Sequence, residues 1–89
     1  MRLDKFLQVS RLVKRRTLAH TLCEAGRVRI NGAAAKPAAS VRLGDVITIS
    51  RGDRRLVAKV VAVPDRPQPA GDLVEILGRI SMKDLTIGT

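Results

Sequence analysis

The sequence has almost no aromatic residues: Phe6 is the only phenylalanine among 89 residues, and tryptophan and tyrosine are absent. Proteins that bind single-stranded RNA by base identity stack the bases on exposed rings, so this mode of binding is disfavoured. The single cysteine, Cys23, excludes an intrachain disulfide. With one histidine, His20, it cannot complete a metal site. We expect Cys23 to be a small hydrophobe at the edge of the core, His20 to be partly exposed, and no metal or other cofactor to be bound.

Long apolar runs are also missing. No segment approaches the roughly 20 apolar residues of a membrane span, and the N-terminus lacks the apolar stretch of a signal peptide. We therefore expect a cytoplasmic protein. The length predicts one domain with a modest core, and the chain opens at Met1 directly into its first motif, as in a complete protein.

Acidic residues are scarce, and the surplus of basic residues is unevenly spread. The net charge is +9; residues 1–29 hold eight basic and two acidic residues, and the other sixty hold nine and six. Leu3, Phe6 and Leu7 recur at helical spacing, so one helix face can pack on a core while the other is basic. Such a face suits a polyphosphate, most simply RNA. The predicted RNA-binding residues are Arg2, Lys5, Arg11, Lys14, Arg15 and Arg16. Arg29 and Lys36 are weaker candidates, because a solvated strand face explains them equally well.

The periodicity predicts two helices, at residues 3–10 and 15–25, joined by a basic turn. Leu18, Leu22 and Ala25 form the expected buried stripe of the second helix, and Gly26 ends it. No capping residue stands at position 14 or 15, so free amides at the start of this helix would suit an RNA phosphate.

From residue 27 the period changes to two, which is typical of strands. Asn31-Gly32 predicts a tight hairpin, and further turns are expected at Leu43-Gly44-Asp45 and Gly52-Asp53. The expected strands are 27–30, 33–36, 46–50, 54–63 and 73–77. Residues 64–72 contain three of the four prolines and predict a loop, and the tail after Gly78 is of uncertain order. The predicted fold is α+β, with two N-terminal helices followed by a small, mainly antiparallel sheet.

Four ordered segments carry a resemblance to a known family: Arg2–Leu7, Lys14–Ala19, Gly26–Gly32 and Leu43-Gly44-Asp45. In order and spacing they resemble the S4-type, or αL-motif, RNA-binding domain over residues 1 to about 50. The resemblance implies an RNA-binding domain over residues 1–63, followed by a loop, a last strand and a tail at 64–89. Among S4-type proteins, the chain is most similar to the RqcP (YabO) family of bacterial ribosome-associated quality-control factors. The small heat-shock S4 proteins are related.

This resemblance implies a non-enzymatic factor that binds the rRNA of obstructed large ribosomal subunits carrying peptidyl-tRNA. It would support alanine tailing by an RqcH-type partner, and it would be a monomer when free. An S4-type assembly, recycling or heat-shock factor is the alternative.

Two other classes of protein are less well supported. A helix-turn-helix DNA-binding protein does not require the sheet that is predicted to follow the helices. Arg2-Leu3-Asp4 matches a catalytic tripeptide of pseudouridine synthases, but those enzymes need a large catalytic domain. We expect Asp4 instead to favour the positive end of the first helix and to pair with a neighbouring arginine.

Overall fold

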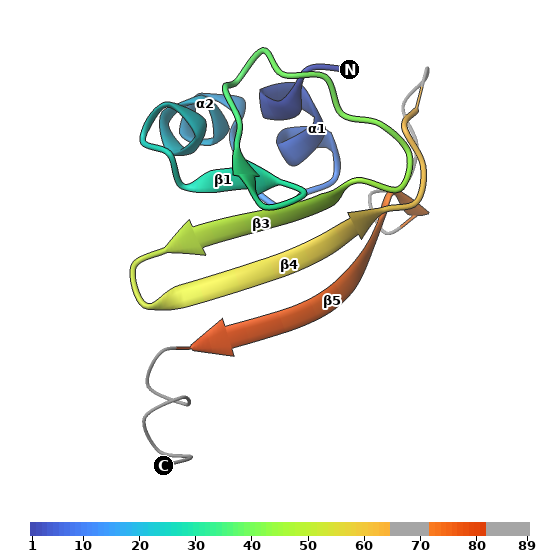
Figure 1. Ribbon diagram of the computed structural model, residues 1–89. Helices are drawn as coiled ribbons and strands as arrows, with labels where there is room; N and C mark the ends of the chain where they lie inside the picture. Colours follow the sequence, from blue (N-terminus) through green and yellow to red (C-terminus); the bar gives the residue numbers. More distant parts are fainter. Residues whose placement is uncertain (65–71, 82–89) are drawn as a thin grey trace.

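The computed structural model describes residues 1–64 and 72–81 and consists of two short helices followed by one sheet (Figure 1). The elements are α1 Leu3–Val9, α2 Arg16–Glu24, β1 Val28–Ile30, β2 Ala33–Ala34, β3 Val46–Arg51, β4 Arg54–Val60 and β5 Val74–Ser81. The strands lie in the order β2-β1-β3-β4-β5, each antiparallel to its neighbours. The predicted α+β fold is confirmed.

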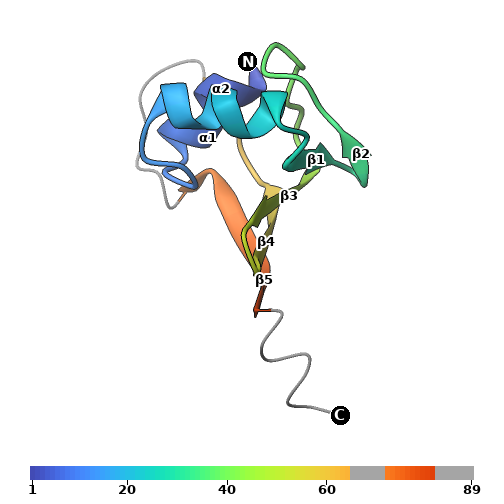
Figure 2. The same ribbon diagram turned by 90° about the vertical axis from the view of Figure 1, so that its left-hand side faces the viewer.

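The two helices lie together beside β1 and β3, and β4 and β5 extend away from them (Figures 1 and 2). The helical spacing of Leu3, Phe6 and Leu7 buries all three side chains completely. They form one core with side chains of the sheet such as Val28 and Ile47. No helix in the described ranges is long and apolar enough to cross a membrane.

The buried face of α2 differs from the predicted one. Ala19 and Cys23 are its most buried residues, whereas Leu18 and Leu22 are only partly buried and Ala25 is exposed. Ala25 follows the last residue of α2 as its C-cap, so it lies beyond the packed part of the helix. The prediction weighted the large aliphatic side chains, but the core here has room for two small ones one turn apart. Gly26 ends the helix with a φ of +73°, as predicted.

Cys23 is 2% exposed and belongs to the core itself, deeper than the edge position predicted for it. Burial raises the pKa of the Cys23 thiol to about 11, with smaller contributions from the negative charges of Asp4 and Glu24. At neutral pH the thiol is therefore protonated and packs as a small hydrophobe.

The predicted hairpin at Asn31-Gly32 is confirmed and contacts the next predicted turn. Both residues have positive φ, at 53° and 85°, and they join β1 to β2. The Asn31 side-chain amide donates to the Asp45 carboxylate at 3.1 Å, and its oxygen accepts from the Val46 N–H at 2.9 Å. Asp45 also accepts from the Arg42 N–H at 2.9 Å. Two sequence motifs thus form one hydrogen-bonded junction.

The strand boundaries differ from the prediction by more than one residue in three places. β2 ends at Ala34, β4 ends at Val60, and β5 continues beyond Leu77 to Ser81. The last difference arises at Gly78, which the sequence pattern predicts to lie just beyond the end of the strand. Gly78 pairs with Val57 beside a β-bulge, a position where glycine is common within strands, and the ladder continues past it.

Two parts of the prediction lie outside the described residues: most of the proline-containing loop, at 65–71, and the end of the tail, at 82–89. The division of the chain at residue 63 stays a prediction. The sheet runs across that point, because β5 pairs with β4 along its whole length.

Candidate nucleic-acid interface

The centre of the basic helical surface is an acid, Asp4, whose side chain is only 4% exposed in the first turn of α1. Arg2 donates to it twice, from Nε to Oδ1 and from Nη2 to Oδ2, both at 3.2 Å. The backbone N–H of Lys5 donates to Oδ1 at 2.7 Å. Both carboxylate oxygens therefore have charge-assisted or backbone donors, as a charge withdrawn from water requires.

Two residues of α2 complete this cluster. Arg16 places Nη2 3.5 Å from Asp4 Oδ1, and His20 places Nδ1 3.7 Å from Oδ2. Arg16 and His20 are four residues apart, so they lie on the same helix face. His20 also places Nε2 3.9 Å from Glu24 Oε1. One buried carboxylate thus connects the start of α1 to the start of α2; we call Arg2, Asp4, Arg16 and His20 the Asp4 cluster.

The pKa of Asp4 is lowered in spite of its burial. Loss of water around the carboxylate by itself raises the pKa. The hydrogen bonds from Arg2 and the Lys5 backbone, together with the positive charges of Arg16 and Arg2, outweigh that effect. The same hydrogen bond raises the pKa of Arg2. Asp4 is ionised at neutral pH and holds both guanidinium groups.

Arg2 and Arg16 remain about half exposed, at 49% and 48% of their side chains. Each guanidinium has several N–H donors, so it can contact Asp4 and a second acceptor in solvent at the same time. An arginine that is already anchored loses less conformational freedom when it binds a phosphate. The structure therefore brings two of the six predicted RNA-binding residues into a fixed pair.

The other four predicted residues are exposed, and none forms an ion pair within the described part of the chain: Lys5, Arg11, Lys14 and Arg15. Arg15 is the N-cap residue of α2, and no side chain caps this helix, as predicted. An RNA phosphate at its free amides stays a prediction, as do the RNA contacts of all six residues.

Arg11 adopts a backbone conformation that is unfavourable for its residue type. It follows the Ser10 C-cap of α1 with a φ of +60°, where glycine or asparagine is usual. The left-handed conformation costs a residue with a Cβ about 1–2 kcal/mol. Strain of this kind is often found at functional positions.

The prediction included the pairing of Asp4 with a neighbouring arginine but left out its contacts with α2. Arg16 and His20 are 12 and 16 residues away in the sequence, and sequence spacing alone does not show how two helices pack. The available signal was that Asp4 is the one acid among the first sixteen residues, followed by Arg16 and His20 on one face of the next helix.

Comparison with known proteins identifies the domain. The S4 domain model matches residues 1–47, which contain the whole Asp4 cluster. The RQC P-site tRNA stabilizing factor of Halalkalibacterium halodurans is 45% identical over 85% of this chain and 89% of that protein. The factor of the same name from Bacillus subtilis is 43% identical over 86% of this chain and 92% of that protein. The chain belongs to the S4-domain family of RQC P-site tRNA stabilizing factors.

The fold of this S4-domain protein has a solved counterpart. The trimeric structure of Vibrio cholerae Heat Shock Protein 15 has a TM-score of 0.77 and 32% identity, and covers 98% of this chain and 87% of that one. The predicted resemblance to S4-type quality-control factors, with the heat-shock S4 proteins as relatives, is confirmed. RNA binding is therefore favoured over the helix-turn-helix hypothesis.

We expect Asp4→Asn to destabilise the fold by about 1–2 kcal/mol at pH 7, because charged hydrogen bonds are lost. Because the pKa of Asp4 is lowered by folding, its ionised form stabilises the folded state. This stabilisation is fully present above the pKa of an aspartate in the unfolded chain, about 3.9. It is lost as pH falls through the folded-state pKa. The free energy of unfolding, measured with urea, should therefore differ more between the wild type and the variant at pH 7 than at pH 3.

The control for Asp4→Asn is Glu24→Gln, which removes one acid that is 53% exposed and contacts the same His20. It should change stability by less than about 0.5 kcal/mol at both pH values. If the loss of unfolding free energy caused by Asp4→Asn is the same at pH 7 and pH 3, the ionised carboxylate does not stabilise the fold.

Arg11→Gly should relieve backbone strain, whereas Arg11→Ala should retain it, because alanine also has a Cβ. The gain is partly offset by the greater freedom of glycine in the unfolded chain. We expect the glycine variant to be up to about 1 kcal/mol more stable than the alanine variant, a Tm difference of about 4–8 °C at most. Calorimetry of the two variants, which have the same charge, measures this; a less stable glycine variant would disprove the strain.

Proposed function

We propose that this protein holds peptidyl-tRNA in the P site of an obstructed large ribosomal subunit and thereby supports alanine tailing by an RqcH-type partner. The observation that carries the proposal is the anchoring of Arg2 and Arg16 on the buried Asp4 carboxylate within the S4 domain. The names of relatives that match most of the chain support the tRNA and the P site. Its place of action is then the bacterial cytoplasm, where ribosomes are.

The proposed ligand is folded RNA, recognised by the positions of its phosphates. Phe6 is the only phenylalanine, tyrosine or tryptophan of the chain, and it is fully buried in the core. No such ring is therefore available for base stacking, the usual means of reading single strands. Exposed arginines and lysines around the Asp4 cluster can instead contact phosphates, which fix position and orientation.

Stabilising a bound tRNA requires positioning and no catalytic side chain, so the proposed role is non-enzymatic. Arg2 and Arg16 would supply anchored contacts, and the exposed Lys5, Lys14 and Arg15 would add charge. The rRNA of the large subunit is the second proposed partner. We propose a monomer when free, although the similar Vibrio cholerae protein is described as trimeric.

Binding of this protein to labelled tRNA should weaken steeply with salt, because each phosphate contact releases counterions. Four to six contacts give a slope of log affinity against log salt of roughly −4 to −5, with the duplex DNA coefficient applied to folded RNA. Arg16→Ala should reduce the slope by about one unit and lower Tm modestly, because Asp4 loses one positive partner but keeps the hydrogen bonds from Arg2 and the Lys5 N–H. A slope near zero for the wild type would contradict the proposal.

The sharper control uses variants that raise the net charge. Asp4→Asn and Glu24→Gln each change it from +9 to +10. If charge alone determined affinity, both would bind tRNA more tightly. We expect Asp4→Asn to bind more weakly, because Arg2 and Arg16 lose their anchor, while Glu24→Gln binds as well as the wild type or better.

In cells, deletion of the gene should reduce alanine tails on stalled chains, and a plasmid encoding Arg16→Glu should fail to restore them. The protein should co-sediment with large subunits that carry peptidyl-tRNA in preference to empty subunits. If a folded Arg16→Glu protein restores tailing fully, the helical surface does not carry the function. If deletion leaves the tails unchanged, an assembly or recycling role replaces quality control.

A further inference from the structure

A second group of arginines lies on the sheet, away from the Asp4 cluster. In the ladder between β3 and β4, Arg51 is directly opposite Arg54, and Ile49 is opposite Leu56. Arg79 of β5 is the partner of Leu56. Side chains alternate between the two faces of a strand, and paired residues share a face. All five residues therefore lie on one face of the sheet.

This is the face that forms the core nearer the helices. Along β4, Ala58 and Val60 lie on the same face as Arg54, and both are buried. Ile47 of β3 pairs with Ala58, so it lies on this face too, and it is also buried. The sheet extends beyond the helices (Figure 2). In that extension the positions that would otherwise continue the core are occupied by arginine.

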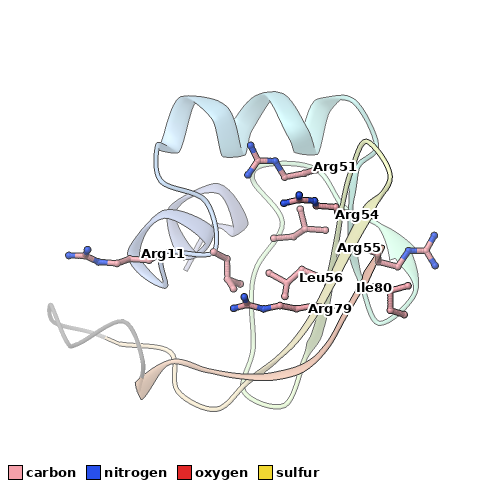
Figure 3. Close-up of a pocket in the computed structure, with 9 residues that line it drawn as sticks. Arg11, Arg51, Arg54, Arg55, Leu56, Arg79 and Ile80 are labelled. Carbon is pink, nitrogen blue, oxygen red and sulfur yellow. The ribbon is translucent and has the colours of Figure 1, made fainter. Parts of the chain in front are cut away.

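Figure 3 shows Arg51, Arg54 and Arg79 pointing to the same side of the sheet, while Arg55 points to the opposite side. The open cleft at this place has a volume of about 810 Å³. Leu12, Ile49, Leu56 and Ile80 supply its apolar lining, and Arg11 lies at its edge with its side chain pointing away from the sheet. We call this the arginine cleft.

The arginines of the cleft form no ion pair within the part of the protein that the structure describes. Every ion pair in the described residues involves Asp4 or Glu24, and neither of these acids contacts an arginine of the sheet. Like charges directly opposite each other on a sheet are destabilising, which is the case for Arg51 and Arg54. The arrangement costs stability in the free protein and favours a polyanionic ligand.

We propose that the arginine cleft binds the sugar-phosphate backbone of a structured RNA, as a second surface beside the Asp4 cluster. All charged residues that line it are arginines, whose planar forks bind phosphate oxygens through two parallel hydrogen bonds. Arg51, Arg54 and Arg79 lie on three neighbouring strands, about 5 Å apart from strand to strand, so they form a row that a continuous backbone can follow.

The two surfaces lie at opposite ends of α1. Arg2 and Asp4 are at its start, and Arg11 and Leu12 follow its end. This inference deepens the proposed function, on which it rests, because it gives the protein contacts with two separate stretches of folded RNA.

The test compares two double variants that have the same net charge of +7. Arg54→Gln with Arg79→Gln alters the arginine cleft, and Arg42→Gln with Lys59→Gln alters two exposed residues that do not line it. The probes are labelled tRNA and a 20-base-pair RNA duplex. We expect the cleft variant to bind RNA about tenfold more weakly in 0.15 M salt, with a salt slope smaller by about two units. The control should change affinity less than threefold.

Stability supplies an independent readout. Because the variant relieves repulsion between Arg51 and Arg54, its Tm should equal or exceed that of the wild type. If the cleft variant fails to fold, Arg54→Lys with Arg79→Lys replaces it. The lysine variant retains the net charge and the salt slope. It should still bind RNA more weakly than the wild type, because the bidentate contacts of arginine are lost.

Equal RNA affinity of the cleft variant and its control would overturn the inference. The inference would also be overturned if the cleft variant lost binding to poly-glutamate but kept its RNA binding, because the ligand of the cleft would then be an acidic protein segment. If Arg16→Ala weakens binding and the cleft variant does not, only this inference fails. If deletion of the gene leaves alanine tails unchanged while the cleft variant still binds RNA weakly, the proposed function fails and the cleft remains an RNA site.

Discussion

The arrangement of the helical surface depends on one buried carboxylate. Asp4 has little contact with water, so its charge must be balanced by nearby donors, and those donors come from the start of α1 and from α2. Any packing of the two helices that separated Arg16 from Asp4 would weaken that balance. The acid therefore helps to hold the two helices together, beside their shared apolar core, and it positions the guanidinium groups that face solvent.

A surface made only of exposed basic side chains would have the same net charge but a different behaviour. Free lysines and arginines attract any polyanion and must be ordered when they bind. Arg2 and Arg16 are ordered beforehand by an internal partner, at the cost of one negative charge on an otherwise basic surface. Such preorganisation favours specificity over attraction at long range, which suits a protein that must distinguish one RNA arrangement among many.

The sequence predicted best those features whose cause is local. Asn31-Gly32 and Gly26 require positive φ, and each marks its turn wherever the rest of the chain lies. The alternation of apolar residues located β3 and the start of β4. The motifs of the S4 domain located the basic helical surface, because Arg2 and Arg16 both fall within them.

What the sequence did not reveal depends on contacts between distant segments. The burial of Ala19 in place of Leu18 follows from the position of α2 on the core, and the contact between Arg16 and Asp4 follows from the same packing. The end of β5 was misplaced because Gly78 is compatible with either a bulge or a strand end, and only pairing with β4 decides between them. The arginine cleft combines residues from β3, β4 and β5, so it exists only once the register of the sheet is set.

The two proposed RNA-binding surfaces lie at the two ends of the seven-residue helix α1, and this placement has a consequence for selectivity. A protein with a net charge of +9 binds many RNAs weakly through either surface alone. When both surfaces find phosphates at once, the second contact forms at high effective concentration, and the affinities reinforce each other. The rigid α1 and the sheet set the distance that the RNA must match. Selectivity for a composite of two RNA segments can thus arise from spacing alone, without a base-specific contact.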